Sequence, residues 1–127
     1  MEVRKGLLYS KDHEWVQEVS ESVVRVGISA YAQDQLGDIV YIELPEIDAE
    51  VAKGESFTVV ESVKAASDVF SPVSGKIVAV NEKLEDSPEL INESPYDEGW
   101  IIEVKSDELE LSDLMTAEEY ARYIEEV

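Results

Sequence analysis

Lys64 stands out among the residues that could do chemistry, because no other basic residue lies near it in the sequence. It is the only basic residue of the stretch FTVVESVKAASDVFSPVSG (57–75), in a chain with 30 acidic and 10 basic side chains. A lysine amine on its flexible stem is a common target of covalent modification. Two plainer interpretations remain open: an exposed lysine without a role, or a helical turn that pairs Glu61 with Lys64 at i,i+3.

The other residue types and motifs of the sequence do not form a recognisable catalytic site. His13 is the only histidine, and the segment HEW lacks the second histidine of a zinc-binding H-E-x-x-H helix. The chain has no cysteine, which excludes thiolate catalysis, disulfides and sulfur ligands. No G-x-S-x-G elbow and no glycine-rich nucleotide loop is present. The sequence therefore predicts no catalytic residue and no metal ligand.

Length and charge set the class of protein. At 127 residues with 44% hydrophobic and 31% charged residues, the chain is expected to form one soluble domain over residues 1–127. No apolar run is long enough to span a bilayer, and no signal peptide is visible. The formal net charge of −20 argues against nucleic-acid binding, because phosphate contacts need clustered Lys and Arg.

Short β segments must position Lys64. Residues 13–28 read as a hairpin with SES as its turn, and DIVYIELP as a strand that Pro45 stops. The β-branched runs FTVV and DVFSPV flank ESVKAASD, which fits a hairpin tip with the whole lysine stem in solvent. Further strands are expected in SGKIVAVN and WIIEV, while EIDAEVAKGE and residues 82–99 read as turn and loop.

Helices are expected only at the margins. Ser29 can cap a short helix that Gly37 ends in the left-handed conformation. Thr116 and Glu119 form a capping box for a C-terminal helix, and ELELSDLM before it reads as a helical turn. Many short strands with marginal helices predict a mainly β fold, either a sandwich or a small barrel.

Four blocks of the sequence resemble the glycine cleavage system H protein family. VESVKAASDVFSPVSGKIVAVN (60–81) is similar to its lipoyl-lysine segment, and YSKDHEW (9–15), GISAYAQDQLGDIVYIELPE (27–46) and LINESPYDEGW (90–100) resemble further blocks in the same order. The likeness runs from about residue 7 to the end. Biotin carriers typically place the lysine between methionines, and acyltransferase lipoyl domains place Asp before it, whereas Val63 and Ala65 flank Lys64.

The resemblance implies a barrel-sandwich hybrid fold with Lys64 at a hairpin tip, amide-linked to lipoate. It also implies a non-catalytic, monomeric carrier in the cytoplasm, or in the mitochondrial matrix of a eukaryote. The implied partners are a glycine decarboxylase (P-protein), an aminomethyltransferase (T-protein), dihydrolipoyl dehydrogenase, and a lipoate ligase or lipoyl/octanoyl transferase. No nucleic acid and no membrane is expected among them.

Three acids gain roles from this resemblance. The loaded arm ends in an amine that is protonated near neutrality, and a carboxylate can bind it through charge-assisted hydrogen bonds. The resemblance places the sheltering cleft near KDHEW, which makes Glu14 the first candidate and Asp68 the second. Glu61 is a candidate for recognition by the lipoylating enzyme. Each of the three could instead be a solvated acid.

Other residues near the expected cleft have packing or partner roles. His13 and Trp15 are expected to pack or to orient the cleft rather than to react. The helix 30–36 could meet the aminomethyltransferase, although Tyr31 and Gln35 stand where family members often carry histidines. That departure puts the partner contact in question and leaves the lipoyl role untouched.

Three alternatives stay open on the sequence. The chain could be an H-like paralogue that relays lipoate to other enzymes, an interaction module whose lysine is unmodified, or a free-standing enzyme. The surroundings of Lys64 do not separate the first of these from a glycine cleavage carrier.

Overall fold

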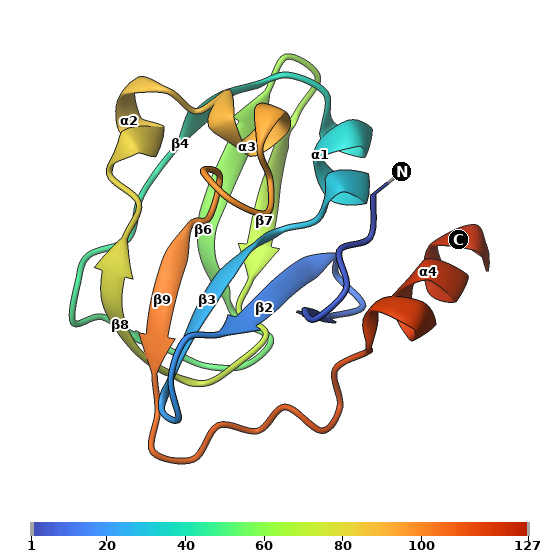
Figure 1. Cartoon of the computed structure of the whole chain (residues 1–127). Helices are drawn as coiled ribbons and strands as arrows, with labels where there is room; N and C mark the ends of the chain where they lie inside the picture. The colour runs from blue at the N-terminus through green and yellow to red at the C-terminus, as the bar shows by residue number, and fades with distance from the viewer. Residues whose placement is uncertain (1, 127) are drawn as a thin grey trace.

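Two antiparallel sheets make up the body of the protein, and the computed structural model describes residues 2–126 (Figure 1). The larger sheet has the order β1-β2-β3-β9-β8-β5, and the smaller one β4-β6-β7. The strands are β1 (Leu8–Tyr9), β2 (Glu14–Glu18), β3 (Val23–Ile28), β4 (Ile39–Ile42), β5 (Glu50–Val51), β6 (Ser56–Ser62), β7 (Ala66–Phe70), β8 (Gly75–Val80) and β9 (Ile102–Lys105). The helices are α1 (Ala30–Leu36), α2 (Lys83–Asp86), α3 (Leu90–Glu93) and α4 (Ala117–Glu126). The predicted mainly β class with marginal helices is confirmed.

The predicted hairpin at residues 13–28 is the β2–β3 pair. Trp15 lies opposite Gly27 in its register, and the indole is fully buried. A Cβ at position 27 would lie 2.7 Å from the indole ring, so this strand position requires a residue without a side chain. The indole Nε1 donates a hydrogen bond of 2.9 Å to the Pro95 carbonyl, which ties the hairpin to the loop after α3.

Helix α1 begins and ends where the sequence predicts. The Ser29 side chain caps it by accepting a hydrogen bond of 3.1 Å from the Ala32 N–H. Gly37 ends it with φ 81° and ψ −163°. The positive φ agrees with the prediction, but this ψ is not that of the left-handed helix, because the chain extends directly into β4. That strand already ends at Ile42, before Pro45.

The β6–β7 hairpin carries Lys64, and its tip is shorter than predicted. Only residues 63–65 lie between the two strands, so most of ESVKAASD belongs to the ladder. Glu61 lies opposite Ala66 and Val60 opposite Ser67. The alternative of a helical turn with an i,i+3 ion pair is therefore wrong, because Glu61 is a strand residue.

Three other segments differ from their expected structure. EIDAEVAKGE contains the short strand β5, and the expected loop at 82–99 contains α2 and α3. Each of these helices is one turn anchored by a fully buried residue, Leu84 or Ile91, and is too short for a helical period to show. ELELSDLM forms no helix: Leu109 and Leu111 alternate towards the core as in extended chain, and the predicted turn is limited to one hydrogen bond of 3.1 Å from the Leu114 N–H to the Leu111 carbonyl.

Two clusters of side chains fill the interior. The larger is aliphatic and is drawn from both sheets, with Val26, Val60, Ile77 and Val104 fully buried. The second is aromatic and lies between β1, β2 and α4. The predicted capping box of α4 is present: the Thr116 N–H donates to the Glu119 carboxylate, and the Glu119 N–H to the Thr116 hydroxyl.

The aromatic cluster attaches α4 to the rest of the fold. Tyr120 stacks on Tyr9, with ring centroids 4.4 Å apart and ring planes within 2°. Figure 1 shows α4 beyond the β2 end of the large sheet, reached by a long connection from β9. Among the helices of residues 2–126, none is long and apolar enough to cross a membrane.

Candidate functional site

The tip of the β6–β7 hairpin presents Lys64 to solvent. The Ser62 N–H donates a hydrogen bond of 2.8 Å to the Ala65 carbonyl. The Ser62 hydroxyl oxygen accepts from the backbone N–H groups of Lys64 and Ala65, each at 3.2 Å. The Val63 N–H donates at 3.0 Å to the Asp38 carbonyl, so the tip is also fixed to the α1–β4 connection. The backbone is held while the lysine side chain is exposed.

Gly37 leaves room for the lysine stem. A Cβ on Gly37 would lie 3.2 Å from Lys64 Cε and 3.6 Å from Cδ. The stem therefore runs over the end of α1, and the expectation that all of it extends into solvent is wrong. The hairpin tip and the end of α1 form one surface around the amine.

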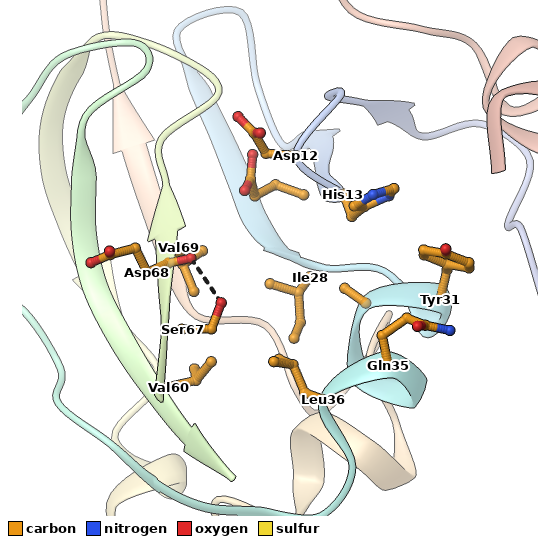
Figure 2. A pocket seen from close by; sticks show the side chains of 12 residues that line it. Asp12, His13, Ile28, Tyr31, Gln35, Leu36, Val60, Ser67, Asp68 and Val69 are labelled. Carbon is orange, nitrogen blue, oxygen red and sulfur yellow. Dashed lines mark hydrogen bonds between the residues drawn. The ribbon is translucent and has the colours of Figure 1, made fainter. Parts of the chain in front are cut away.

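A pocket of about 290 Å³ adjoins the hairpin. Apolar side chains from β3, α1, β6 and β7 form its walls: Ile28, Leu36, Val60 and Val69. Figure 2 shows Ile28 and Leu36 facing the hairpin residues across this space, with Tyr31 and Gln35 of α1 at one side. Val60 lies four residues before Lys64 and Ser67 three after it, about 10–13 Å along the strands at 3.3 Å per residue.

Glu14 is the buried carboxyl of this pocket. It begins β2 and is only 2% exposed. Burial raises its pKa from 4.5 to about 7, opposed by a hydrogen bond of 2.5 Å from the Ser10 hydroxyl and by one from the Phe70 backbone, while Asp12 raises the pKa further. Near neutral pH, Glu14 is thus divided between its neutral and charged forms. Such a carboxyl gains its charge when a cation approaches.

The other two predicted acids have their side chains on the outside of the hairpin. Successive strand residues face opposite sides, and Ser67 and Val69 face the pocket. The Asp68 carboxylate points away from it in Figure 2 and accepts a hydrogen bond of 3.0 Å from the Ser56 hydroxyl. Glu61 is exposed in β6. Glu14 and Asp68 are thus both among the residues that line the pocket, although the Asp68 carboxylate points away from its centre, and Glu61 is not among them.

His13 forms part of the rim in an unusual backbone conformation, with φ 73°. Its Nδ1 is hydrogen-bonded to the Tyr120 hydroxyl at 2.8 Å, and its ring lies 4.8 Å from that of Tyr31. Burial lowers the pKa of this histidine. The imidazole is thus fixed by α4 and by α1.

Tyr120 is a residue that the sequence reasoning missed as part of this region. Its hydroxyl is also bonded to the Ser29 hydroxyl at 2.7 Å, so one phenol joins the cap of α1 to His13. The capping box predicted the helix that carries Tyr120, but no local pattern predicts a contact across 107 residues. In the part of the chain that the structure describes, no three acidic or histidine side chains are grouped as a metal site.

Comparisons with known proteins agree with one another. A family model described as glycine cleavage H-protein matches residues 7–127. Two proteins named glycine cleavage system H protein, from Vibrio vulnificus (strain YJ016) and Vibrio cholerae (strain O395), are 57% and 58% identical over 123 residues, which is 96% of this chain and 98% of each relative. One of the same name from Coprothermobacter proteolyticus is 55% identical over 99% of this chain and 100% of its own length.

A solved structure shows the same fold. The crystal structure of a glycine cleavage system H protein from Mycobacterium marinum has a TM-score of 0.88 and 38% identity, covering 96% of this chain and 98% of that one. This confirms the barrel-sandwich hybrid fold. Since the family model and the relatives span nearly the whole chain, the chain belongs to the glycine cleavage H-protein family.

Proposed function

We propose that this chain is the lipoyl-bearing shuttle of the glycine cleavage system, with lipoate joined through an amide bond to Lys64. One observation carries the proposal. An exposed lysine stands at the tip of a hairpin whose inner face forms one wall of a pocket that contains a buried carboxyl, Glu14.

The residues around Lys64 fit such a group. The amine is exposed, and Gly37 leaves space for the stem that bears it. The pocket combines aliphatic walls with one carboxyl, which suits an arm that has an apolar body and a polar end. When bound, lipoate would supply a disulfide that takes up the aminomethyl group of glycine at the decarboxylase, yields its carbon to tetrahydrofolate at the aminomethyltransferase, and is reoxidised by dihydrolipoyl dehydrogenase.

The chain itself would bind and shelter without catalysing a step. Glu14 would accept charge-assisted hydrogen bonds from a protonated amine at the end of the arm. A nearby ammonium group lowers the pKa of a carboxyl, so Glu14 would be charged when the amine is present. The walls of Ile28, Leu36 and Val69 would keep water from the carbon next to that amine.

The proposal also covers the domain organisation, oligomeric state, cellular location and partners of the chain. The chain would act as one carrier domain over residues 1–127, as a monomer that meets its partners transiently in the cytoplasm, or in the mitochondrial matrix of a eukaryote. Its partners would be the decarboxylase, the aminomethyltransferase, the dehydrogenase, and a lipoate ligase or lipoyl/octanoyl transferase.

The test is intact-mass analysis in two steps. Incubation with a lipoate ligase, ATP and lipoate is expected to add one lipoyl group, mapped to Lys64, and none to Lys64→Arg. Glycine and the decarboxylase are then expected to add one aminomethyl group. Glu14→Gln is expected to accept lipoate as the wild type does but to lose the aminomethyl group to water faster. A wild-type chain that gains no lipoyl group from an active ligase would contradict the proposal.

A further inference from the structure

The outer side of the small sheet carries most of the exposed large apolar side chains. Six such residues are exposed within residues 2–126, and four of them belong to this sheet or its tip. These are Val40 at 55%, Tyr41 at 51%, Val59 at 36% and Val63 at 66% exposed. Exposed large apolar side chains gathered on one sheet are a feature of protein–protein contacts.

The register places Tyr41 and Val59 on one face, while Val40 lies in the bulge between Ile39 and Tyr41 and Val63 lies in the hairpin tip. Tyr41 lies opposite Glu61, which lies opposite Ala66, and Val59 lies opposite Asp68. Directly paired residues share a face of the sheet. From β6 and β7 the pocket is lined by Val60, Ser67 and Val69 of the other face, and also by Asp68. We call the exposed surface formed by Val40, Tyr41, Val59 and Val63, with Glu61 and Asp68, the outer hairpin face.

The outer hairpin face continues into a shallow groove. The groove has a volume of about 280 Å³, and its apolar lining is Leu44, Pro45, Phe57 and Val59. It also contains the exposed Glu43. Apolar side chains therefore occur along this sheet from beside Lys64 to the groove, and the exposed Glu61 and Glu43 lie among them.

The charged residues of this surface are mostly acidic. Glu43, Glu61 and Asp68 are all exposed beside it, and Lys64 is the only basic residue between positions 54 and 75. Acylation of Lys64 would remove that single cation. A complementary partner surface would have an apolar centre bordered by arginine or lysine.

We propose that the outer hairpin face is the docking surface of the enzyme that acylates Lys64, an inference that rests on the proposed function. Before acylation there is no arm for an enzyme to hold, so the Lys64 amine enters an active site only if the enzyme contacts the hairpin itself. The enzymes that act on the far end of a lipoyl arm already attached to Lys64 need not contact the hairpin, because the arm spans the distance between them. In the ligase reaction the Lys64 nitrogen bonds to the carbonyl carbon of lipoyl-adenylate, the amine loses a proton and AMP leaves, with ATP as the source of the adenylate.

The experiment compares the initial rate of lipoylation, followed by intact mass, across concentrations of the carrier. The variants are Tyr41→Ser and Val59→Ser. Val19→Ser is the matched control, because Val19 is as exposed as Tyr41, at 51%, but lies in the β2–β3 turn of the other sheet. Thermal unfolding and circular dichroism establish that all variants are folded.

The expected result is a KM for the carrier about tenfold higher for Tyr41→Ser, as for a central apolar contact residue, with kcat nearly unchanged. Val59→Ser is also expected to raise the KM for the carrier, and Val19→Ser is expected to have the wild-type KM. Added salt is expected to raise the wild-type KM, because opposite charges meet across the contact.

Three results would overturn the proposal. The first is a wild-type KM in both variants. The second is an unchanged ligase KM together with a raised KM for the decarboxylase acting on fully lipoylated Tyr41→Ser, which would assign the face to an enzyme of the cycle. The third is a wild-type dimer that Tyr41→Ser dissociates, which would assign it to a second copy. Failure of the proposed function differs from all three, since the wild type would then gain no lipoyl group at all.

Discussion

Replacing Glu14 with glutamine is expected to stabilise the protein at alkaline pH and to flatten its dependence on pH. In the folded state burial raises the pKa of Glu14 from 4.5 to about 7. Between these two values the folded chain holds a proton that the unfolded chain has released. The contribution of this proton to stability is complete below pH 4.5 and is lost as the pH rises through 7.

The magnitude follows from the two pKa values. The interval from 4.5 to about 7 corresponds to about 3 kcal/mol, at 1.36 kcal/mol per pKa unit. That is a large part of the total stability of about 5–15 kcal/mol usual for a domain. Glutamine has nearly the shape of the neutral carboxyl, and its amide oxygen can still accept the hydrogen bond from Ser10.

The assay is urea unfolding from pH 4.5 to 8.5 with Glu14→Gln, the wild type and Glu18→Gln. Glu18 lies at the other end of β2 and is exposed, so its replacement removes the same formal charge from a solvated position. The free-energy difference between Glu14→Gln and the wild type is expected to grow by about 3 kcal/mol across the range. For Glu18→Gln, the plot of the free energy of unfolding against pH is expected to run parallel to that of the wild type. Parallel curves for all three proteins would refute the reasoning about Glu14.

Three further outcomes are expected. Gly37→Ala should lower the free energy of unfolding by about 1–3 kcal/mol in urea, because φ is 81° and the new methyl would lie 3.2 Å from Lys64 Cε; an unchanged midpoint would contradict this geometry. Tyr120→Phe should lower it by about 1–3 kcal/mol, because His13 Nδ1 and the buried Ser29 hydroxyl lose their shared partner. Lys64→Arg should unfold at the wild-type temperature, since its side chain is exposed, and a large shift would mean that the lysine is structural.

Local patterns predicted the elements that position Lys64. The β-branched runs on either side of ESVKAASD predicted the hairpin, and Ser29 and Gly37 predicted the limits of α1. These features depend on residues close in sequence, through caps and turn chemistry. The one-turn helices α2 and α3 escaped prediction because a four-residue segment holds no full hydrophobic period.

The pocket was less predictable, because it depends on long-range contacts and on register. The resemblance pointed to Glu14, but Glu14 lines the pocket together with residues of β3, α1, β6 and β7 that are distant in sequence, and nothing in KDHEW indicates that. Asp68 was expected in the hairpin tip, where strand alternation does not apply, so the sequence did not predict on which side of the hairpin its side chain lies. Because the tip has only three residues, Asp68 falls within the ladder, and strand alternation then fixes its carboxylate on the outside.

This alternation explains how one hairpin can serve two purposes. Val60, Ser67 and Val69 face the pocket, while Val59 and Asp68 face solvent. The hydrogen bonds of Ser62 across the tip set this register, and a slip of one residue would exchange the two faces. The same slip would move an acid into the pocket and a wall residue out of it. The short, closely bonded tip therefore serves more than the display of a lysine, because it keeps the apolar pocket wall and the acidic outer hairpin face on opposite sides of the sheet.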